Sequence, residues 1–521
     1  MVNQLTKLLI LRHKYSNMLS YNNYIDYKTD INMTNSANNV QEFLLELLKK
    51  LDFRYKREID TLLKFKKKEL GKLPEQFNQL NSWDVQYYMT HWKQEYGVSE
   101  NILKNYFEYD TTLKNIFSLY ESLFDIKFKK INSKKKSWHQ DVDEYEIISV
   151  DSNDSDDFKN NNTKNNVIGY LYLDLFSRND KPKQTRCFSI QPACNYPAKT
   201  NKYTIPVIAL LASITNTSKS NTSILLPYQD VTSLFHEFAH VIHHVFGKTK
   251  YVIFSGTNVE SDFVETPAYL LDLLCLDKQV LKKISSHYIN KTPLSDDIIN
   301  KLIKLKNVEI GLTFKKNIML SLFDQVVYSS SEFIKLCEKS CNNESDMQHI
   351  FKDVYKKLHT EIMINENKQF MYKINTSSDI MYHPEWIHSC CNIDSLYYCF
   401  IWSKVLASDL YMEKLKNKPI NNLIGNELKE KIFRYGGSRS ALELINNYLN
   451  RKPAIDGFIS MFDLDTDMEY SFFFNSDQIN NKTLPTESDE IKDPYSDSPL
   501  ECSEQINKFS EINESSVNYI Y

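Results

Sequence analysis

Apolar residues recur at spacings of three and four along most of the chain, a pattern that is typical of amphipathic helices. In residues 38–70 one helical face is apolar, formed by Phe43, Leu44, Leu47, Leu48 and Leu51. Comparable patterns occur around 83–96, 101–126, 267–284, 297–320, 346–362, 394–416 and 440–450. The chain is therefore predicted to be mainly α-helical.

Strand-like apolar runs are confined to one part of the chain, at 145–150, 168–176, 186–190 and 207–214. These runs predict one small β-sheet. Residues 151–166, between the first two runs, are polar and indicate a hairpin insertion. The chain from residue 475 onward is rich in Asn, Ser, Asp and Glu, which is typical of a disordered acidic tail.

Charge and hydropathy exclude several classes of partner. A formal net charge of -4 over 521 residues gives no reason to expect nucleic acid or an anionic membrane as a partner. No run approaches the roughly 18 apolar residues that a membrane span needs. We expect the basic runs at 64–68 and 127–136 to be solvated faces rather than binding patches.

Cysteine usage and the N-terminal residues bear on the compartment. The nine cysteines show no paired spacing, which favours free thiols in a reducing compartment. The first residues contain a brief apolar patch without a small-residue cleavage site, so they are a poor match to a signal peptide. We therefore expect a cytoplasmic location.

Residues 233–246, "SLFHEFAHVIHHVF", hold four of the twelve histidines. The stretch has an apolar stripe at helical spacing, and Asp230 or Thr232 is expected to cap a helix that runs through Phe246. A core helix that happens to be rich in histidine is the alternative to a metal site. His243 shares the face of the other histidines, and we expect it to be a partly exposed helix residue.

His236 and His240 are four residues apart, so both imidazoles project from one face of the helix. Two such imidazoles can bind the same zinc ion. Glu237 then lies beside the metal, where it can take a proton from a water that the metal activates. The His-Glu-x-x-His pattern thus predicts a zinc site, provided that a third ligand exists.

The third ligand is sought downstream, because Phe246 occupies the place of the third histidine of a metzincin-type site. Glu260 and Glu265 are the candidates, and Glu265 is spaced to face Asp272. Asp272 would then accept a hydrogen bond from a ligating imidazole. Alternatively, Asp262 and Glu265 form a capping box at the start of a helix. Spacing alone leaves both interpretations open.

The segment "FHEFAHVIHH", followed by "GTNVESDFVETPAYLLD", resembles the thimet oligopeptidase family of zinc peptidases, the M3 family. The segments at 11–27, 170–178 and 436–458 are also similar to family segments, although Ala239 replaces the usual glycine of the zinc helix. The resemblance implies one zinc ion per chain. It also implies the ligands His236, His240 and Glu265, with Glu237 as the general base.

The segment at 386–406 is similar to the family pattern H-x-x-x-G-Y…Y-Y-x-Y-x-W, with matches at His388, Tyr397, Tyr398 and Trp402. The resemblance implies that His388, together with Tyr397 or Tyr398, orients substrate and stabilises the oxyanion. Four positions depart from the pattern, namely Cys391, Asn392, Ile393 and Phe400. Phenylalanine has no hydroxyl donor, and losing one oxyanion donor typically costs about 10²–10³ in turnover.

The resemblance implies a two-lobed helical metallopeptidase with a small β-sheet beside the zinc helix and a deep channel between the lobes. We expect an N-terminal helical part over 1–140, a catalytic region over 141–470 and the acidic tail over 471–521. Full-length relatives carry a helical portion before the segment matched by 11–27, so we expect a more open channel here.

The predicted function is that of a monomeric, zinc-dependent endopeptidase that hydrolyses short, unstructured peptides. The alternative is a peptide-binding pseudoenzyme that keeps zinc but has little turnover. The replacements at Ile393 and Phe400 motivate this alternative.

Overall fold

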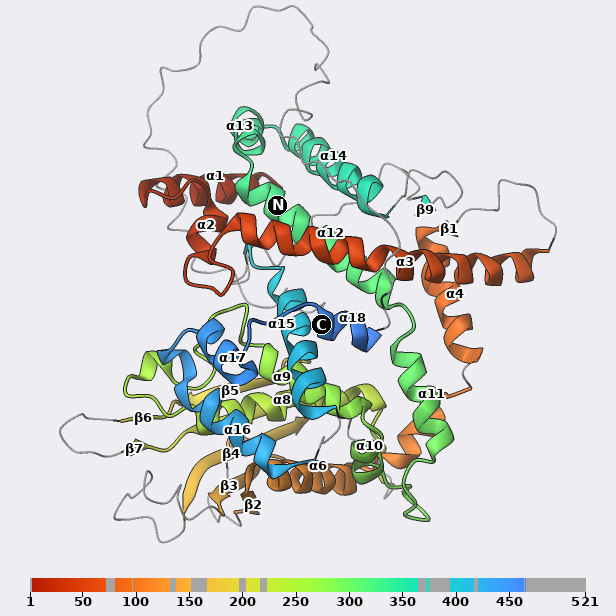
Figure 1. The fold of residues 1–521 in the computed structure, drawn as a ribbon, viewed down its shortest axis with the longest axis vertical. Helices are drawn as coiled ribbons and strands as arrows, with labels where there is room; N and C mark the ends of the chain where they lie inside the picture. The colour runs from red at the N-terminus through yellow and green to blue at the C-terminus, as the bar shows by residue number, and fades with distance from the viewer. Residues whose placement is uncertain are drawn as a thin grey trace, which may run out of the picture.

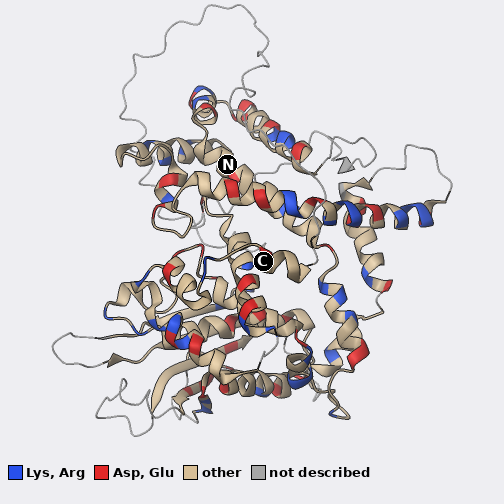
Figure 2. Cartoon of the chain, viewed as in Figure 1, with Lys and Arg blue, Asp and Glu red and all other residues tan. Residues whose placement is uncertain are grey.

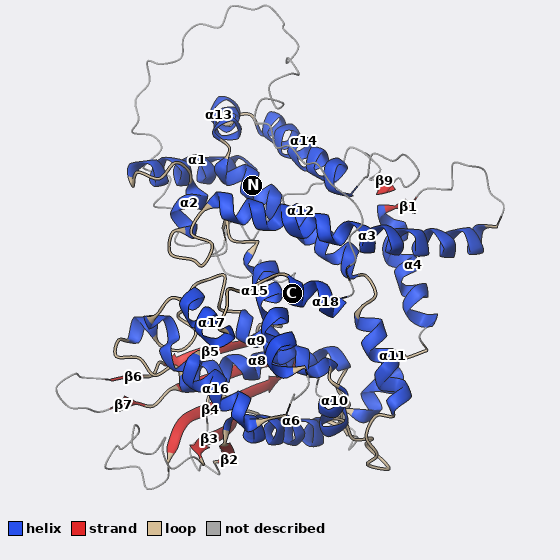
Figure 3. Cartoon of the chain, viewed as in Figure 1, coloured by secondary structure: helices blue, strands red, loops and turns tan. Residues whose placement is uncertain are grey.

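The computed structural model describes residues 2–71, 80–95, 97–131, 137–150, 166–195, 203–215, 223–363, 372–373, 394–416, 420–462 and 464. Helices dominate these residues, and the main strands gather in one half of the molecule (Figure 3). The predicted mainly α-helical fold with one small sheet is confirmed. The tail expected at 471–521 and all but the last residue of the insertion expected at 151–166 lie outside the described residues.

Two hydrophobic cores organise the described residues, and the first is built around two long helices. These are α3 (Ala37–Leu70) and α12 (Ile310–Ser329), which lie side by side in the upper half of Figure 1. The helices that pack with them are α1 (Val2–Met18), α2 (Tyr24–Thr29), α4 (Ser82–Glu95), α13 (Ser331–Ser340), α14 (Glu344–Met363) and α18 (Asp456–Phe462).

The second core lies in the lower half of Figure 1 and contains the sheet with its covering helices. These helices are α6 (Tyr109–Phe124), α8 (Tyr228–Phe246), α9 (Thr266–Asp272), α10 (Lys278–Ile284), α11 (Asp296–Lys306), α16 (Asn422–Lys431) and α17 (Ala441–Leu449). Helix α15 (Cys399–Leu410) joins the cores, since its first half packs in the first core and its second half in the second.

The main sheet has five strands in the order β2-β3-β4-β8-β5. Their bounds are β2 (Ile126–Lys130), β3 (Asp143–Ser149), β4 (Val167–Phe176), β5 (Arg186–Gln191) and β8 (Val207–Ile214). The β4–β8 pair is parallel and the other pairs are antiparallel. The four predicted strand regions are confirmed. Strand β2 was not predicted, because it lies in the basic run that was interpreted only as a solvated face.

The remaining elements are short. They are β1 (Leu80–Asn81), α5 (Glu100–Leu103), β6 (Cys194–Asn195), β7 (Tyr203–Thr204) and β9 (Tyr372–Lys373), with several single helical turns. No helix in the described ranges is long and apolar enough to cross a membrane.

The two cores alternate along the chain. Residues of the first core come from 2–89, 308–405 and 458–464, and nearly all residues of the second come from 103–302 and 406–449. The expected boundary at residue 140 falls between β2 and β3, which pair in one sheet. It therefore does not separate the cores, because long-range packing rather than chain order divides this molecule.

Positive charge gathers on the C-terminal part of α3 (Figure 2). Lys64, Lys67 and Lys68 are exposed there, as expected for a solvated face. Lys66 is the exception, because it is buried and its Nζ lies 2.6 Å from a carboxylate oxygen of Asp84 on α4. This pair holds α4 against α3.

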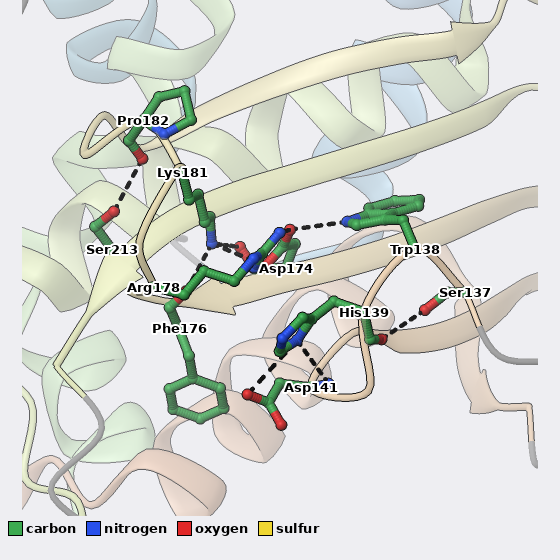
Figure 4. A network of polar contacts seen from close by, with 10 residues as sticks. All are labelled: Ser137, Trp138, His139, Asp141, Asp174, Phe176, Arg178, Lys181, Pro182 and Ser213. Atoms are coloured by element: carbon green, nitrogen blue, oxygen red, sulfur yellow. Dashed lines mark hydrogen bonds and ion pairs between the residues drawn. The ribbon is translucent and has the colours of Figure 1, made fainter.

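A polar network fixes the turn that follows β4 on the way to β5 (Figure 4). Asp174, which is buried near the end of β4, accepts hydrogen bonds from Arg178, Lys181 and Trp138 at 2.6–2.9 Å. Burial alone would raise the pKa of the Asp174 carboxyl, but these donors hold it well below its usual range. The network thus stabilises the entry to β5, the edge strand that contacts α8.

Candidate metal centre

Helix α8 carries the histidine cluster and contacts β5, β8 and α9. Its apolar side chains are buried in the second core, as the sequence stripe predicted. The helix begins at Tyr228, directly after Pro227, so the predicted caps Asp230 and Thr232 both lie inside the first turns. The Thr232 hydroxyl instead donates to the carbonyl oxygen of Gln229.

His236, His240 and Glu265 come together at one point. The Nε2 atoms of His236 and His240 lie 3.1 and 3.4 Å from Oε2 of Glu265. Candidate ligand atoms of the three residues all lie within 4.8 Å of one another. The two histidines project from successive turns of α8, and Glu265 reaches them from the residue before α9. This donor set of two imidazoles and one carboxylate fits a zinc ion.

The capping-box alternative is excluded by the same geometry. Glu265 occupies the N-cap position of α9, but no side-chain cap bond forms there. The Asp262 carboxylate instead accepts the backbone N–H groups of Met33 and Thr34, from a loop of distant sequence. Glu265 is therefore free of a capping role, and its carboxylate lies against the histidines.

Asp272 contacts His236 at Nδ1, the ring nitrogen that does not face Glu265. Its Oδ2 lies 2.9 Å from Nδ1 of His236, the hydrogen bond that the sequence predicted. Burial disfavours the charged imidazole, but Asp272 and Glu265 outweigh it and raise the pKa of His236 to about 10. A carboxylate on Nδ1 fixes the ring and leaves Nε2 to face the Glu265 side chain.

Glu237 lies between the histidines and the edge of the sheet. Burial raises the pKa of its carboxyl, and the neighbouring His240 and His236 oppose that shift. The backbone of Cys187 on β5 lies close to the same carboxylate and also lowers its pKa. A raised pKa is what a general base needs, because proton transfer is most efficient when its pKa approaches the working pH.

The other histidines of α8 do not join the metal group. His243 was expected to be partly exposed, but it is only 1% exposed and lies beside Phe263 and Phe433. Burial lowers its pKa to about 3, so it remains neutral. His244 contacts the Thr257 hydroxyl at 3.2 Å, and burial lowers its pKa to about 4.

Comparison with known proteins agrees with this geometry. The family model described as Peptidase family M3 matches residues 1–464. The chain belongs to peptidase family M3. This confirms the resemblance inferred from the sequence.

The curated relatives of this M3 chain are peptidases. A "Thimet-like oligopeptidase" of Dictyostelium discoideum is 29% identical over 461 residues, covering 87% of this chain and 63% of the relative. "Saccharolysin" of Saccharomyces cerevisiae is 26% identical over 458 residues, covering 87% and 60%. The chain thus spans only about 60% of the length of these relatives. The solved structure "PZ PEPTIDASE A with inhibitor 2" aligns with a TM-score of 0.47 at 12% identity, covering 89% of this chain and 65% of that chain.

The tyrosine segment of the M3 chain is described from Asp394 onward, so His388 and Ile393 lie outside the described residues. Tyr397 is half-buried, and its ring lies 5.8 Å from that of Phe400. Tyr398 is fully buried, and its hydroxyl donates to Asp262 at 3.0 Å. Substrate cannot reach that hydroxyl in this arrangement, which argues against the predicted oxyanion role of Tyr398.

Three residues near the metal group were missed or misassigned from the sequence. Cys187 lies near the Glu237 carboxylate through its backbone, which no side-chain motif reveals. Asp262 was considered only in the alternative of a capping box, and its actual partners Met33 and Thr34 lie more than 200 residues away. Lys404 lies 5.0 Å over the ring of Tyr269, which in turn lies 5.4 Å from His236.

Proposed function

We propose that the chain is a zinc-dependent endopeptidase that hydrolyses short, unstructured peptides. The convergence of His236, His240 and Glu265 carries this proposal. Three protein ligands are typical of catalytic zinc sites, which keep a position open, whereas structural zinc sites usually have four. When bound, zinc would polarise the scissile carbonyl and lower the pKa of a water molecule at the site.

Glu237 is the general base of the proposed reaction. Its carboxylate takes a proton from the attacking water and returns it to the amine of the leaving peptide. This carboxylate is largely buried and lies close enough to His236 and His240 for both to lower its pKa. Asp272 keeps the His236 ring in the orientation that metal binding requires.

The unpaired edge of β5 is an argument for a peptide substrate. Among the described strands β5 pairs only with β8, so its other edge is unpaired. Strand β5 contacts α8, and the backbone of Cys187 on this strand lies close to the carboxylate of the proposed base. Phe188 and Ile190 are 43% and 53% exposed along the strand. A peptide that adds to this edge must be extended, which favours short or unfolded substrates.

We propose that Tyr397 and His388 assist by orienting the substrate and stabilising the oxyanion. Tyr397 lies two residues before the first residue of α15 and is half-buried, so its side chain is partly accessible. Phe400 supplies no hydroxyl, and we expect turnover below that of a site with a tyrosine there. The monomeric state and the cytoplasmic location stay predictions from the sequence.

The Glu237→Gln variant tests the proposed function with a quenched fluorescent peptide. We expect zinc-dependent cleavage by the unaltered chain, and a loss of about 10²–10⁴ in kcat for Glu237→Gln without loss of zinc. Glu260→Gln is the matched control. This other candidate ligand accepts the N–H of Ala441 and stands outside the metal group, so its variant should cleave at a near-normal rate.

Equal cleavage by the Glu237→Gln variant would contradict the assignment of the base. A zinc-loaded chain that binds peptide but never cleaves it would favour the pseudoenzyme.

A further inference from the structure

Three chain segments that are distant in sequence meet at Asp262. Its Oδ1 accepts the backbone N–H of Met33 at 3.0 Å, and its Oδ2 accepts that of Thr34 at 3.2 Å. The hydroxyl of Tyr398 donates to the same Oδ2 at 3.0 Å and contacts the Thr34 hydroxyl at 2.8 Å. The hydroxyl of Ser403 donates to the backbone oxygen of Asp262 at 2.8 Å. We call this set of contacts the Asp262 cradle.

The Asp262 cradle is buried, and its hydrogen-bond donors match the two oxygens of a carboxylate. Asp262 and Tyr398 are each 0% exposed. No ion pair to Asp262 occurs within the part of the chain that the structure describes, so two N–H groups and one phenol stabilise its charge. An amide could not replace this carboxylate, because its NH₂ group would oppose one of the donors.

The cradle lies within the turn that carries the metal ligand Glu265. The N–H groups of Phe263 and Val264 both donate to the carbonyl oxygen of Glu260 at 3.0 Å, and the N–H of Thr266 donates to Phe263 at 2.8 Å. This compact turn leaves little freedom between Asp262 and Glu265. The position of one therefore sets the position of the other.

Glu265 needs such an anchor more than the histidines do. His236 and His240 share the rigid helix α8, whereas Glu265 comes from a turn between elements. Its distance to the histidines depends on how that turn is held. The Asp262 cradle ties the turn to the loop between α2 and α3, and to the start of α15.

We propose that Asp262 and Tyr398 are positioning residues for Glu265, which hold its carboxylate at the distance that zinc binding requires. The inference rests on the proposed function in one respect, namely that Glu265 is a zinc ligand. It replaces the expected role of Tyr398, since this tyrosine acts on the metal group through Asp262 and never touches substrate. The same hydrogen bonds connect the segment that carries Tyr397 to the turn that carries Glu265.

Zinc affinity and the visible spectrum of the cobalt(II)-substituted chain test this inference. We expect Tyr398→Phe and Asp262→Asn to weaken zinc binding by about 10–100-fold in a chelator competition. The cobalt bands should shift in both variants, because a displaced carboxylate changes the ligand field. Tyr55→Phe is the matched control. It removes a buried hydroxyl that donates to Met363 in the first core, and should leave affinity and spectrum unchanged.

The outcomes separate this inference from the proposed function. Folded Tyr398→Phe protein with unaltered zinc affinity and unaltered cobalt bands would overturn the inference, even if the chain cleaves peptides normally. Weaker zinc binding in both variants of a chain that cleaves no peptide would support the inference and contradict only the proposed function. If Asp262→Asn does not fold, Tyr398→Phe decides the result, because it changes a single hydroxyl.

Discussion

Burial decides the protonation state of His359, which lies away from the metal group. His359 on α14 is 5% exposed, and burial lowers its pKa to about 4. An unfolded histidine has a pKa near 6.5, so acid protonates the unfolded chain first. The stabilising contribution of neutral His359 is complete above about pH 6.5 and is lost as the pH falls towards about 4.

We predict that His359→Leu reduces the acid sensitivity of the fold. Between pH 7.5 and pH 5.0 the unaltered chain should lose about 2 kcal/mol more unfolding free energy than the variant, by proton linkage at this one site. Urea unfolding at both pH values measures the difference. His349→Gln, at an exposed position of the same helix, should behave like the unaltered chain. An identical pH dependence of His359→Leu and the unaltered chain would refute the assignment.

The sequence supports some residues of the site more firmly than others. The spacing of His236 and His240 predicts their shared face, because helix geometry is local. Glu265 could not be separated from a capping role by spacing alone; the family resemblance favoured the ligand role, and the contacts of Glu265 with the histidines and of Asp262 with a distant loop agree with it. The role of Tyr398 was misjudged for the same reason, since its hydrogen-bond partners lie on other segments.

The contact between α3 and α12 depends on a buried carboxylate at the start of α12. Glu58 on α3 accepts the backbone N–H groups of Gly311 and Leu312 at 3.0 and 2.9 Å. These groups have no partner within α12, because the first N–H groups of a helix lack internal acceptors. A side chain at Gly311 would also collide with the backbone of Tyr55. Glu58 therefore fixes how the two helices meet.

We predict that Glu58→Ala destabilises the chain by about 2–4 kcal/mol, since it leaves two buried N–H groups unsatisfied. Chemical denaturation measures the loss. Glu46→Ala, at an exposed position of α3, should change the unfolding free energy by less than about 0.5 kcal/mol. Equal effects of the two substitutions would show that Glu58 does not cap α12.

Element boundaries follow from the sequence where the periodicity is strong. The pattern at 38–70 predicts α3 to within one residue. The single pattern at 297–320 corresponds to two helices in the structure, α11 and α12, because Glu309 between them adopts a left-handed conformation. Strand β2 escapes detection because exposed lysines occupy most of its positions, as is common on edge strands.

At the scale of the whole molecule, two cores share one chain, and the metal group belongs to the second. Amphipathic periodicity predicts the helical class, but it does not tell which helices pack together. The first core joins residues near the N-terminus to residues beyond 308, and this pairing depends on long-range contacts. Helix α15 and the Asp262 cradle connect that core to the turn of Glu265.

The most direct test of the account is a crystal of the zinc-loaded chain measured above and below the zinc absorption edge. We predict one anomalous peak per chain, in contact with Nε2 of His236, Nε2 of His240 and a carboxylate oxygen of Glu265. Asp272 should remain bonded to Nδ1 of His236. A zinc ion bound elsewhere, or one bound to the histidines while Glu265 points away, would contradict the account.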